Sequence, residues 1–177
     1  VEDIILKSSN IGTVRIAQKL GSINLKAFYK NLGLFDPTTL ELPETRGTKP
    51  QKPKKWNNLE TATASYGHGI AVSPIHLATA YAMLVNGGYK VNPTILKKDN
   101  SDLNSDQIIS KKTSENLRLI LEKVVSKGTA RETDFGGYLV GGKTGTAEKP
   151  NPIKGGYYEN KVISTFASAF PISTCLL

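Results

Sequence analysis

Glycines and strand-forming residues are concentrated near the end of the chain, after a long region dominated by helical patterns. The segment Tyr138–Ala147 is typical of a strand whose glycines let another backbone or a ligand approach closely. Val162–Phe170 predicts a second strand, paired with the first across a hairpin loop at Asn151–Asn160. Because helices precede these strands rather than alternate with them, the order predicts an α+β fold with helices packed on an antiparallel sheet.

Four segments before these strands carry helical signals, from apolar residues at helical spacing and from end signals such as Gly21 and Gly128. Ser73 is the expected cap of the third, with Pro74 in its first turn. Positions 89–96 are expected to form a short strand, and positions 35–58, with four prolines, a long irregular segment. The predicted helices are 11–20, 24–31, 74–85 and 117–127.

Length and composition favour one soluble globular domain. The 177 residues suffice for a single core, and no run of about 18 apolar residues exists that could span a membrane. The formal charge of +8 comes partly from four lysines between positions 49 and 55, in a Pro-rich segment. Because base-stacking aromatics are not interleaved with these lysines and no nucleic-acid motif is present, we interpret them as a solvated loop, with attraction to an anionic polymer or membrane surface as the alternative.

Gly137–Thr144 fits the pattern Gly-x-x-x-x-Gly-Lys-Thr of a phosphate-binding loop. That loop requires a buried strand before it and a helix directly after it. Arg131–Phe135 is too polar for the strand, and Gly145 with Pro150 argues against the helix. We therefore favour an exposed strand, on which the Lys143 ammonium and neighbouring threonine hydroxyls can bind a substrate carboxylate. An edge strand with ordinary polar residues is the alternative.

The triplet Ser8-Ser9-Asn10 stands far upstream, directly before the first helical stripe. Any of its three side chains can cap that helix, so capping alone is one explanation of the triplet. A Ser-x-Asn together with a Lys-Thr-Gly is also part of the equipment of serine acyl-transferases, which makes a functional site the other explanation. The two explanations are compatible.

Three motifs in order resemble the transpeptidase domain of class B penicillin-binding proteins, the cell-division type especially. They are Ser8-Ser9-Asn10, the segment Tyr66–Ala78 (YGHGIAVSPIHLA), and Gly128-Thr129-Ala130 followed by Gly141–Glu148 (GGKTGTAE). The resemblance covers residues 1–172, interpreted as a partial transpeptidase domain, and residues 173–177 form a tail that does not match. It implies a serine β-lactamase/transpeptidase-like fold, incomplete at both ends of this chain.

The family's activity is peptidoglycan crosslinking through a serine acyl-enzyme. The resemblance implies that a serine attacks the penultimate D-Ala of a stem peptide, and that an amine on a neighbouring stem peptide then takes the acyl group. β-Lactams are similar in shape to D-Ala-D-Ala and are expected to bind. Neither a metal ion nor a cofactor is expected.

The resemblance also assigns roles to individual residues. Ser8 would pass a proton between the nucleophile and the leaving group, and Asn10 would hold the amide carbonyl of the substrate. Lys143 and the three residues after it would bind the substrate carboxylate. These three residues are Thr144, Gly145 and Thr146. The backbone N–H of Thr146 would contribute to the oxyanion hole. His68 and His76 are expected to be structural.

The family's nucleophile motif, Ser-x-x-Lys, is not in this sequence: no serine has a lysine three positions later. We therefore expect the chain to be a fragment that is inactive alone. A non-catalytic remnant or scaffold module that still binds D-Ala-D-Ala or penicillin is the alternative. For a full-length protein, the resemblance implies anchoring in the bacterial inner membrane with the domain facing the periplasm, and divisome or elongation proteins as partners.

Overall fold

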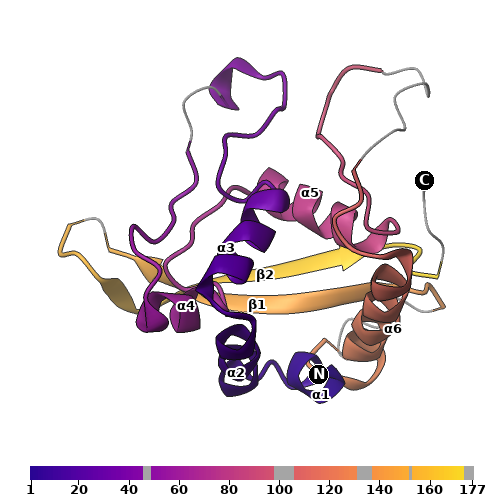
Figure 1. The fold of residues 1–177 in the computed structure, drawn as a ribbon, viewed down its shortest axis with the longest axis horizontal. Helices are drawn as coiled ribbons and strands as arrows, with labels where there is room; N and C mark the ends of the chain where they lie inside the picture. Colours follow the sequence, from indigo (N-terminus) through magenta and orange to yellow (C-terminus); the bar gives the residue numbers. More distant parts are fainter. Residues whose placement is uncertain (46–48, 98–105, 131–136, 152, 174–177) are drawn as a thin grey trace.

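The computed structural model describes residues 1–45, 49–97, 106–130, 137–151 and 153–173. Helical elements come first along the chain and a long hairpin comes last (Figure 1). The elements are α1 (Glu2–Leu6), α2 (Asn10–Leu20), α3 (Ser22–Asn31), the 3-10 turn η1 (Pro43–Thr45), α4 (Asn58–Ala64), α5 (Pro74–Val85), α6 (Lys111–Lys127), β1 (Gly141–Pro150) and β2 (Tyr157–Ala169).

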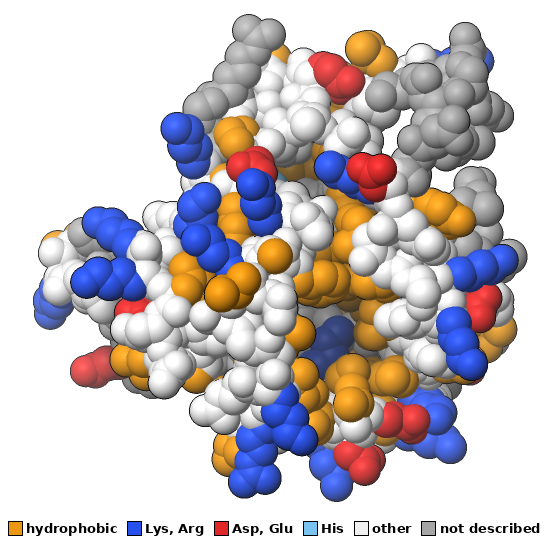
Figure 2. Space-filling model, in the orientation of Figure 1, with side chains coloured by type: hydrophobic (Ala, Val, Ile, Leu, Met, Phe, Trp, Pro, Cys, Tyr) orange, Lys and Arg blue, Asp and Glu red, His pale blue; other side chains and the backbone are white. Residues whose placement is uncertain are grey.

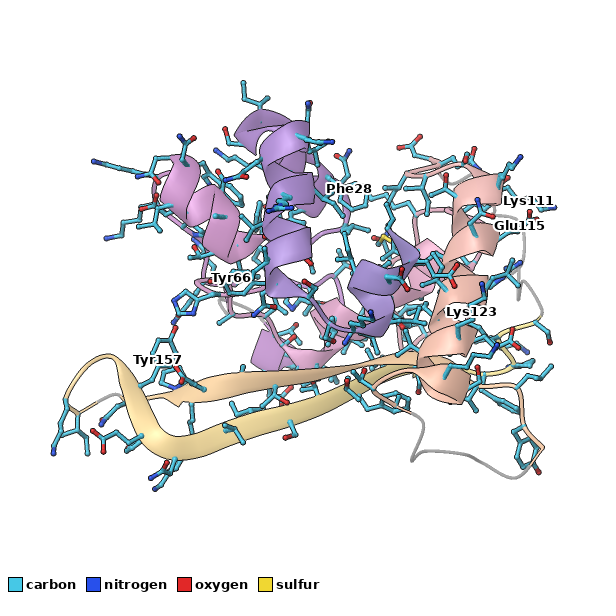
Figure 3. All side chains as sticks on the ribbon, turned by 90° about the horizontal axis from the view of Figure 1, so that it is seen from below. Phe28, Tyr66, Lys111, Glu115, Lys123 and Tyr157 are labelled. Atoms are coloured by element: carbon cyan, nitrogen blue, oxygen red, sulfur yellow. The ribbon has the colours of Figure 1, made fainter. Side chains whose placement is uncertain are left out.

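The sheet of the described residues consists of β1 and β2, which pair antiparallel. Their register runs from Gly141 opposite Ala169 to Glu148 opposite Val162, and after an irregularity Pro150 pairs with Tyr157. The helices lie on one side of this hairpin (Figure 3). The observed order and layering are those of the predicted α+β fold.

The strongest helical patterns correspond to observed helices. The stripe at 11–20 became α2, and the stripe at 117–127 became the inner face of α6, on which Leu121 and Val124 are buried. The helix at 24–31 begins two residues earlier, as α3. The predictions missed α1 and α4, which are too short to show a helical period.

One strand prediction was wrong, and one loop prediction was too long. Positions 89–96 form no strand; Tyr89 makes only an isolated bridge with Gln107, and Pro93 has no N–H to continue a ladder. The predicted hairpin loop at 151–160 is shorter, because β2 begins at Tyr157 and continues the pairing with β1. Most of the predicted polar loop after Lys97, and residues 174–177 of the predicted tail, lie outside the described residues.

One core cluster forms where Leu32, directly after α3, meets α5. Leu32, Ala80 and Met83 are buried together, and partly buried side chains pack around them. The described residues between 35 and 57 are irregular as predicted, apart from η1 and an isolated bridge between Gln51 and Ala71. Aromatic rings attach this segment to the core. Phe35 and Trp56 make edge-to-face contacts with each other and with Tyr29. The ammonium of Lys52, in the lysine-rich segment, lies over the Phe35 ring.

Ser114 on α6 is a buried hydroxyl that ties α6 to the end of α5. Its Oγ donates to the Leu84 carbonyl at 2.7 Å and accepts from the Gly87 N–H at 3.0 Å. We expect Ser114→Ala to lower the free energy of unfolding by about 2 kcal/mol, because both backbone groups lose their partner in a buried place. Urea unfolding measures this loss. Ser126→Ala on the exposed face of α6 is the matched control, with an expected change near zero; equal losses in both variants would contradict the assignment.

Candidate active site

The triplet Ser8-Ser9-Asn10 forms the junction between α1 and α2. Ser9 is the N-cap of α2, and its Oγ accepts a hydrogen bond from the Gly12 N–H at 3.1 Å. Ser8 has a φ of 50°, a left-handed conformation that is uncommon and strained for a residue with a side chain. The capping function therefore belongs to Ser9, and the unusual backbone belongs to Ser8, whose side chain is free of the cap.

The ammonium of Lys143 on β1 donates a hydrogen bond to Ser8 Oγ, across 135 residues of sequence. The same Nζ donates to the Thr144 carbonyl at 2.8 Å. Burial lowers the pKa of the Lys143 ammonium. Two buried glycines, Gly141 and Gly142, precede Lys143, and added Cβ atoms there would fall within 3 Å of Ile172 and Phe166 side-chain atoms. This part of β1 is therefore fixed closely in place.

The threonines of the same strand point differently from Lys143. Adjacent residues of a strand alternate between its two faces, so Thr144 and Thr146 lie on the face opposite Lys143. The Thr144 hydroxyl lies 3.1 Å from that of Thr129, just beyond α6. The predicted carboxylate site placed the ammonium and the hydroxyls together along the strand, and the alternation divides them between two faces. The structure thus unites Lys143 with Ser8 and leaves Thr144 tied to Thr129.

The strand also excludes the phosphate-binding loop. Residues after Lys143 and Thr144 continue as β1 and do not begin a helix, so no helix N-terminus is available for a phosphate at this point.

Asn10, the third predicted catalytic residue, is the first residue of α2 and is exposed. Within the described part of the chain its side-chain amide makes no hydrogen bond, so both its donor and its acceptor are available to a ligand. The surface between α2, α5 and α6 is hollowed over β1, and a Lys or Arg side chain lies at the floor of this hollow (Figure 2).

The two histidines differ in their surroundings. His76 is buried, with Nδ1 at 2.7 Å from Ser73 Oγ and Nε2 at 2.9 Å from the Asp36 carbonyl, in keeping with the predicted structural role. The Ser73 hydroxyl thus pairs with His76, and it does not cap α5 as predicted from its position. His68 is exposed and contacts Tyr157, a contact that no sequence signal indicated.

Within the described ranges, no group of histidine, cysteine, aspartate and glutamate side chains is arranged to hold a metal ion. No helix in the same ranges is both long and apolar enough to cross a membrane.

Comparison with known proteins identifies the family. Residues 1–174 match the family model described as the penicillin binding protein transpeptidase domain. The chain belongs to this family. Its motifs are those of a class B penicillin-binding protein, as the resemblance predicted, and the chain is part of a transpeptidase domain.

Individual relatives agree with this assignment. The chain is 36% identical to the "Probable peptidoglycan D,D-transpeptidase FtsI" of Caulobacter vibrioides, over 96% of the chain and 29% of that protein. The structure of the transpeptidase domain of penicillin-binding protein 3 from Burkholderia pseudomallei superposes with a TM-score of 0.87 at 33% identity, covering 96% of the chain and 51% of that domain structure. Penicillin-binding protein 3 from Mycobacterium tuberculosis in complex with ampicillin gives a TM-score of 0.88 at 25% identity, over 98% of the chain and 42% of that protein chain.

The transpeptidase-like fold is thereby confirmed. The chain spans less than a third of the length of the Caulobacter relative and about half of the Burkholderia domain structure. The predicted boundary at residue 172 remains a prediction.

Proposed function

We propose that this chain is the part of a peptidoglycan D,D-transpeptidase that holds the D-Ala-D-Ala end of a stem peptide. The complete enzyme crosslinks stem peptides through a serine acyl-enzyme and is acylated by penicillins. The nucleophile belongs to a Ser-x-x-Lys motif, which this sequence does not contain. The observation that carries the proposal is the hydrogen bond from Lys143 to Ser8, because it joins the two motifs in one site.

The hydrogen bond has a direction that suits proton transfer. An ammonium only donates, so Ser8 Oγ is the acceptor and its own hydrogen is free to point to another group. The nearby positive charge also favours loss of that hydrogen as a proton. In the proposed reaction Ser8 relays a proton between the nucleophile and the leaving amine, and Lys143 positions Ser8 and stabilises the negative charge that develops.

The remaining site residues hold the substrate. Asn10 binds the amide carbonyl of the peptide. The substrate carboxylate lies against Lys143, and Gly145, on the same face of β1, lets the peptide backbone approach closely. The Thr144 and Thr146 hydroxyls lie on the opposite face of β1 from this carboxylate. The Thr146 N–H contributes to the oxyanion hole. β-Lactams take the place of the D-Ala-D-Ala end.

For the complete protein, we propose an inner-membrane anchor with the transpeptidase domain facing the periplasm. Its protein partners would belong to the divisome or the elongation machinery, as the resemblance to class B penicillin-binding proteins implies.

A peptide titration and a labelling experiment test the proposal together. An acetylated tripeptide ending in D-Ala-D-Ala should bind the chain saturably, measured by calorimetry, whereas the same tripeptide with its carboxylate amidated should bind at least tenfold more weakly. A fluorescent penicillin should give no labelled band on a denaturing gel, because the nucleophile is not in this sequence. Equal binding of acid and amide would overturn the carboxylate site, and a labelled band lost on mutating one serine would show a nucleophile within this chain.

The absence of Ser-x-x-Lys from this sequence also favours a second candidate, a non-catalytic module that binds D-Ala-D-Ala or penicillin. This module would have the same binding site but would not catalyse transpeptidation. A Ser-x-x-Lys segment from a related transpeptidase domain can be added to the chain. Penicillin labelling should then appear if Ser8 and Lys143 can relay the proton, whereas a scaffold module would stay unlabelled.

A further inference from the structure

Among the contacts that join the helical part of the molecule to the hairpin, two lie near opposite ends of β1. The first is the hydrogen bond between Lys143 and Ser8, near the start of β1. The second lies at the other end, where Tyr157, paired with Pro150, meets His68. The Tyr157 Oη and His68 Nδ1 are 3.4 Å apart, and the two ring centroids are 5.4 Å apart.

The second contact belongs to a small exposed aromatic cluster, defined here as Tyr66, His68 and Tyr157. The Tyr66 ring centroid is 6.5 Å from that of His68, and Tyr66 and Tyr157 are 42% and 41% exposed. Tyr66 and Tyr157 lie at the same end of the hairpin, on its helical side (Figure 3). Clustered aromatic rings that remain this accessible offer flat apolar faces to a ligand.

Two glycines with positive φ flank His68 and form the turn that exposes its ring. Gly67 and Gly69 have φ values of 93° and 78°, and no heavy atom lies within 4 Å of a Cβ added to either glycine. These glycines therefore serve the turn itself and do not make room for a neighbouring group. The turn sends the histidine away from α4 and toward the hairpin.

Between the two contacts, β1 offers space to an extended ligand. By strand alternation, the residues that share the face of Lys143 include Gly145 and Ala147, which have little or no side chain. Exposure along β1 increases away from the buried Gly141, and the packing of β1 within the described residues is against β2 and α6. A peptide whose carboxylate lies at Lys143 can therefore extend only toward Pro150, antiparallel to β1.

The distance along β1 from Lys143 to the aromatic cluster matches the length of a stem pentapeptide, and it exceeds the length of its C-terminal tripeptide. The seven residue steps from Lys143 to Pro150 correspond to about 23 Å. A five-residue peptide in extended form covers about 17 Å, which brings its first residue within side-chain reach of the aromatic cluster. A tripeptide covers about 10 Å and ends well short of the cluster.

We propose that the aromatic cluster is a binding subsite for the N-terminal end of the stem peptide, so that the chain distinguishes a long donor peptide from a short one. This inference rests on the proposed function, since it assumes that the peptide carboxylate lies at Lys143. Tyr157 and His68 pack against the first residue of the peptide and its acyl group, as exposed aromatic rings do with apolar ligand groups.

The test compares two peptides on one protein. Calorimetry gives the dissociation constants of an acetylated tripeptide and of an acetylated stem pentapeptide, both ending in D-Ala-D-Ala. We expect the pentapeptide to bind the unmodified chain about tenfold more tightly, and Tyr157→Ala and His68→Ala to remove that advantage without weakening tripeptide binding. Tyr138→Ala, which removes another exposed tyrosine at the far end of the hairpin, should preserve the advantage.

A second measurement needs no variant. The chain has two histidines, so the ring proton signals of exposed His68 and buried His76 can be followed by NMR during titration. The pentapeptide should shift the His68 signal and leave His76 in place, and the tripeptide should shift neither. If both peptides bind equally and neither moves His68, the subsite is refuted while the carboxylate site stands. If neither peptide binds at all, the proposed function fails, and the subsite fails with it.

Discussion

Replacing Lys143 by methionine should weaken binding of an acetyl tripeptide ending in D-Ala-D-Ala by about 100-fold, since a partly buried charge-assisted hydrogen bond contributes about 2–3 kcal/mol. Methionine keeps most of the length of the lysine side chain and removes only the ammonium. The substitution takes away both the positive charge at the carboxylate and the donor that holds Ser8. Calorimetric titration of the two proteins measures the change.

Lys149→Met is the matched control. Lys149 belongs to the same strand and is exposed near its far end, away from Ser8. An exposed lysine at this distance should change the affinity by no more than about twofold, because its charge is screened by solvent. Equal losses in the two variants would mean that general positive charge attracts the peptide and that Lys143 has no special part.

The pH dependence follows from the same ammonium. Burial lowers the pKa of Lys143 below the ordinary value of a lysine, so its charge is lost at a lower pH than the charge of the exposed lysines. Affinity for the peptide should be constant near neutral pH and fall as the pH rises through this lowered pKa. Lys149→Met should show the same fall, and Lys143→Met should show no fall in that range.

The structure explains which features the sequence could predict. Long amphipathic segments such as α2 and α6 repeat their apolar residues often enough to define a period. The bounds of α2 and the end of α6 were predicted closely, but α6 begins six residues before the predicted start at 117. α1 and α4 have five and seven residues, too few for a period. The strand predicted at 89–96 did not form, because β-propensity does not guarantee a partner strand. Among the described residues, the pairing there is a single bridge between Tyr89 and Gln107.

The features of the site also divide into those that the sequence could predict and those that it could not. Strand geometry and composition suggested that Lys143 could hold a carboxylate, but nothing local in the sequence links it to Ser8 across 135 residues; only the family motifs did so. The left-handed backbone of Ser8 was also beyond prediction, since serine rarely adopts it. The contact between His68 and Tyr157 depends on the hairpin register, because Tyr157 begins β2 inside a segment predicted to be loop.

Gly88 is the position at which a single added methyl group should cost the most stability. It follows α5 with a φ of 90°, and a Cβ there would lie 2.0 Å from the carbonyl oxygen of Ile109. The Gly88 carbonyl also accepts the Ile108 N–H at 2.7 Å, so the two backbones cannot separate without losing this bond. We expect Gly88→Ala to lower the free energy of unfolding by about 3 kcal/mol or more, from the strained backbone and the forced displacement of the Ile109 carbonyl together.

Gly155→Ala separates these two causes. Gly155, in the hairpin loop, has a φ of 72° and no heavy atom within 4 Å of its added Cβ, so this variant bears the backbone strain alone. Its expected loss is about 1 kcal/mol, the ordinary cost of a left-handed residue with a side chain. Urea unfolding of both variants against the unmodified chain gives the difference, which reports the close approach of Gly88 to Ile109. If Gly88→Ala loses no more than Gly155→Ala, the segment around Ile109 must be free to move away, and the packing of this segment against the end of α5 would not be a rigid part of the fold.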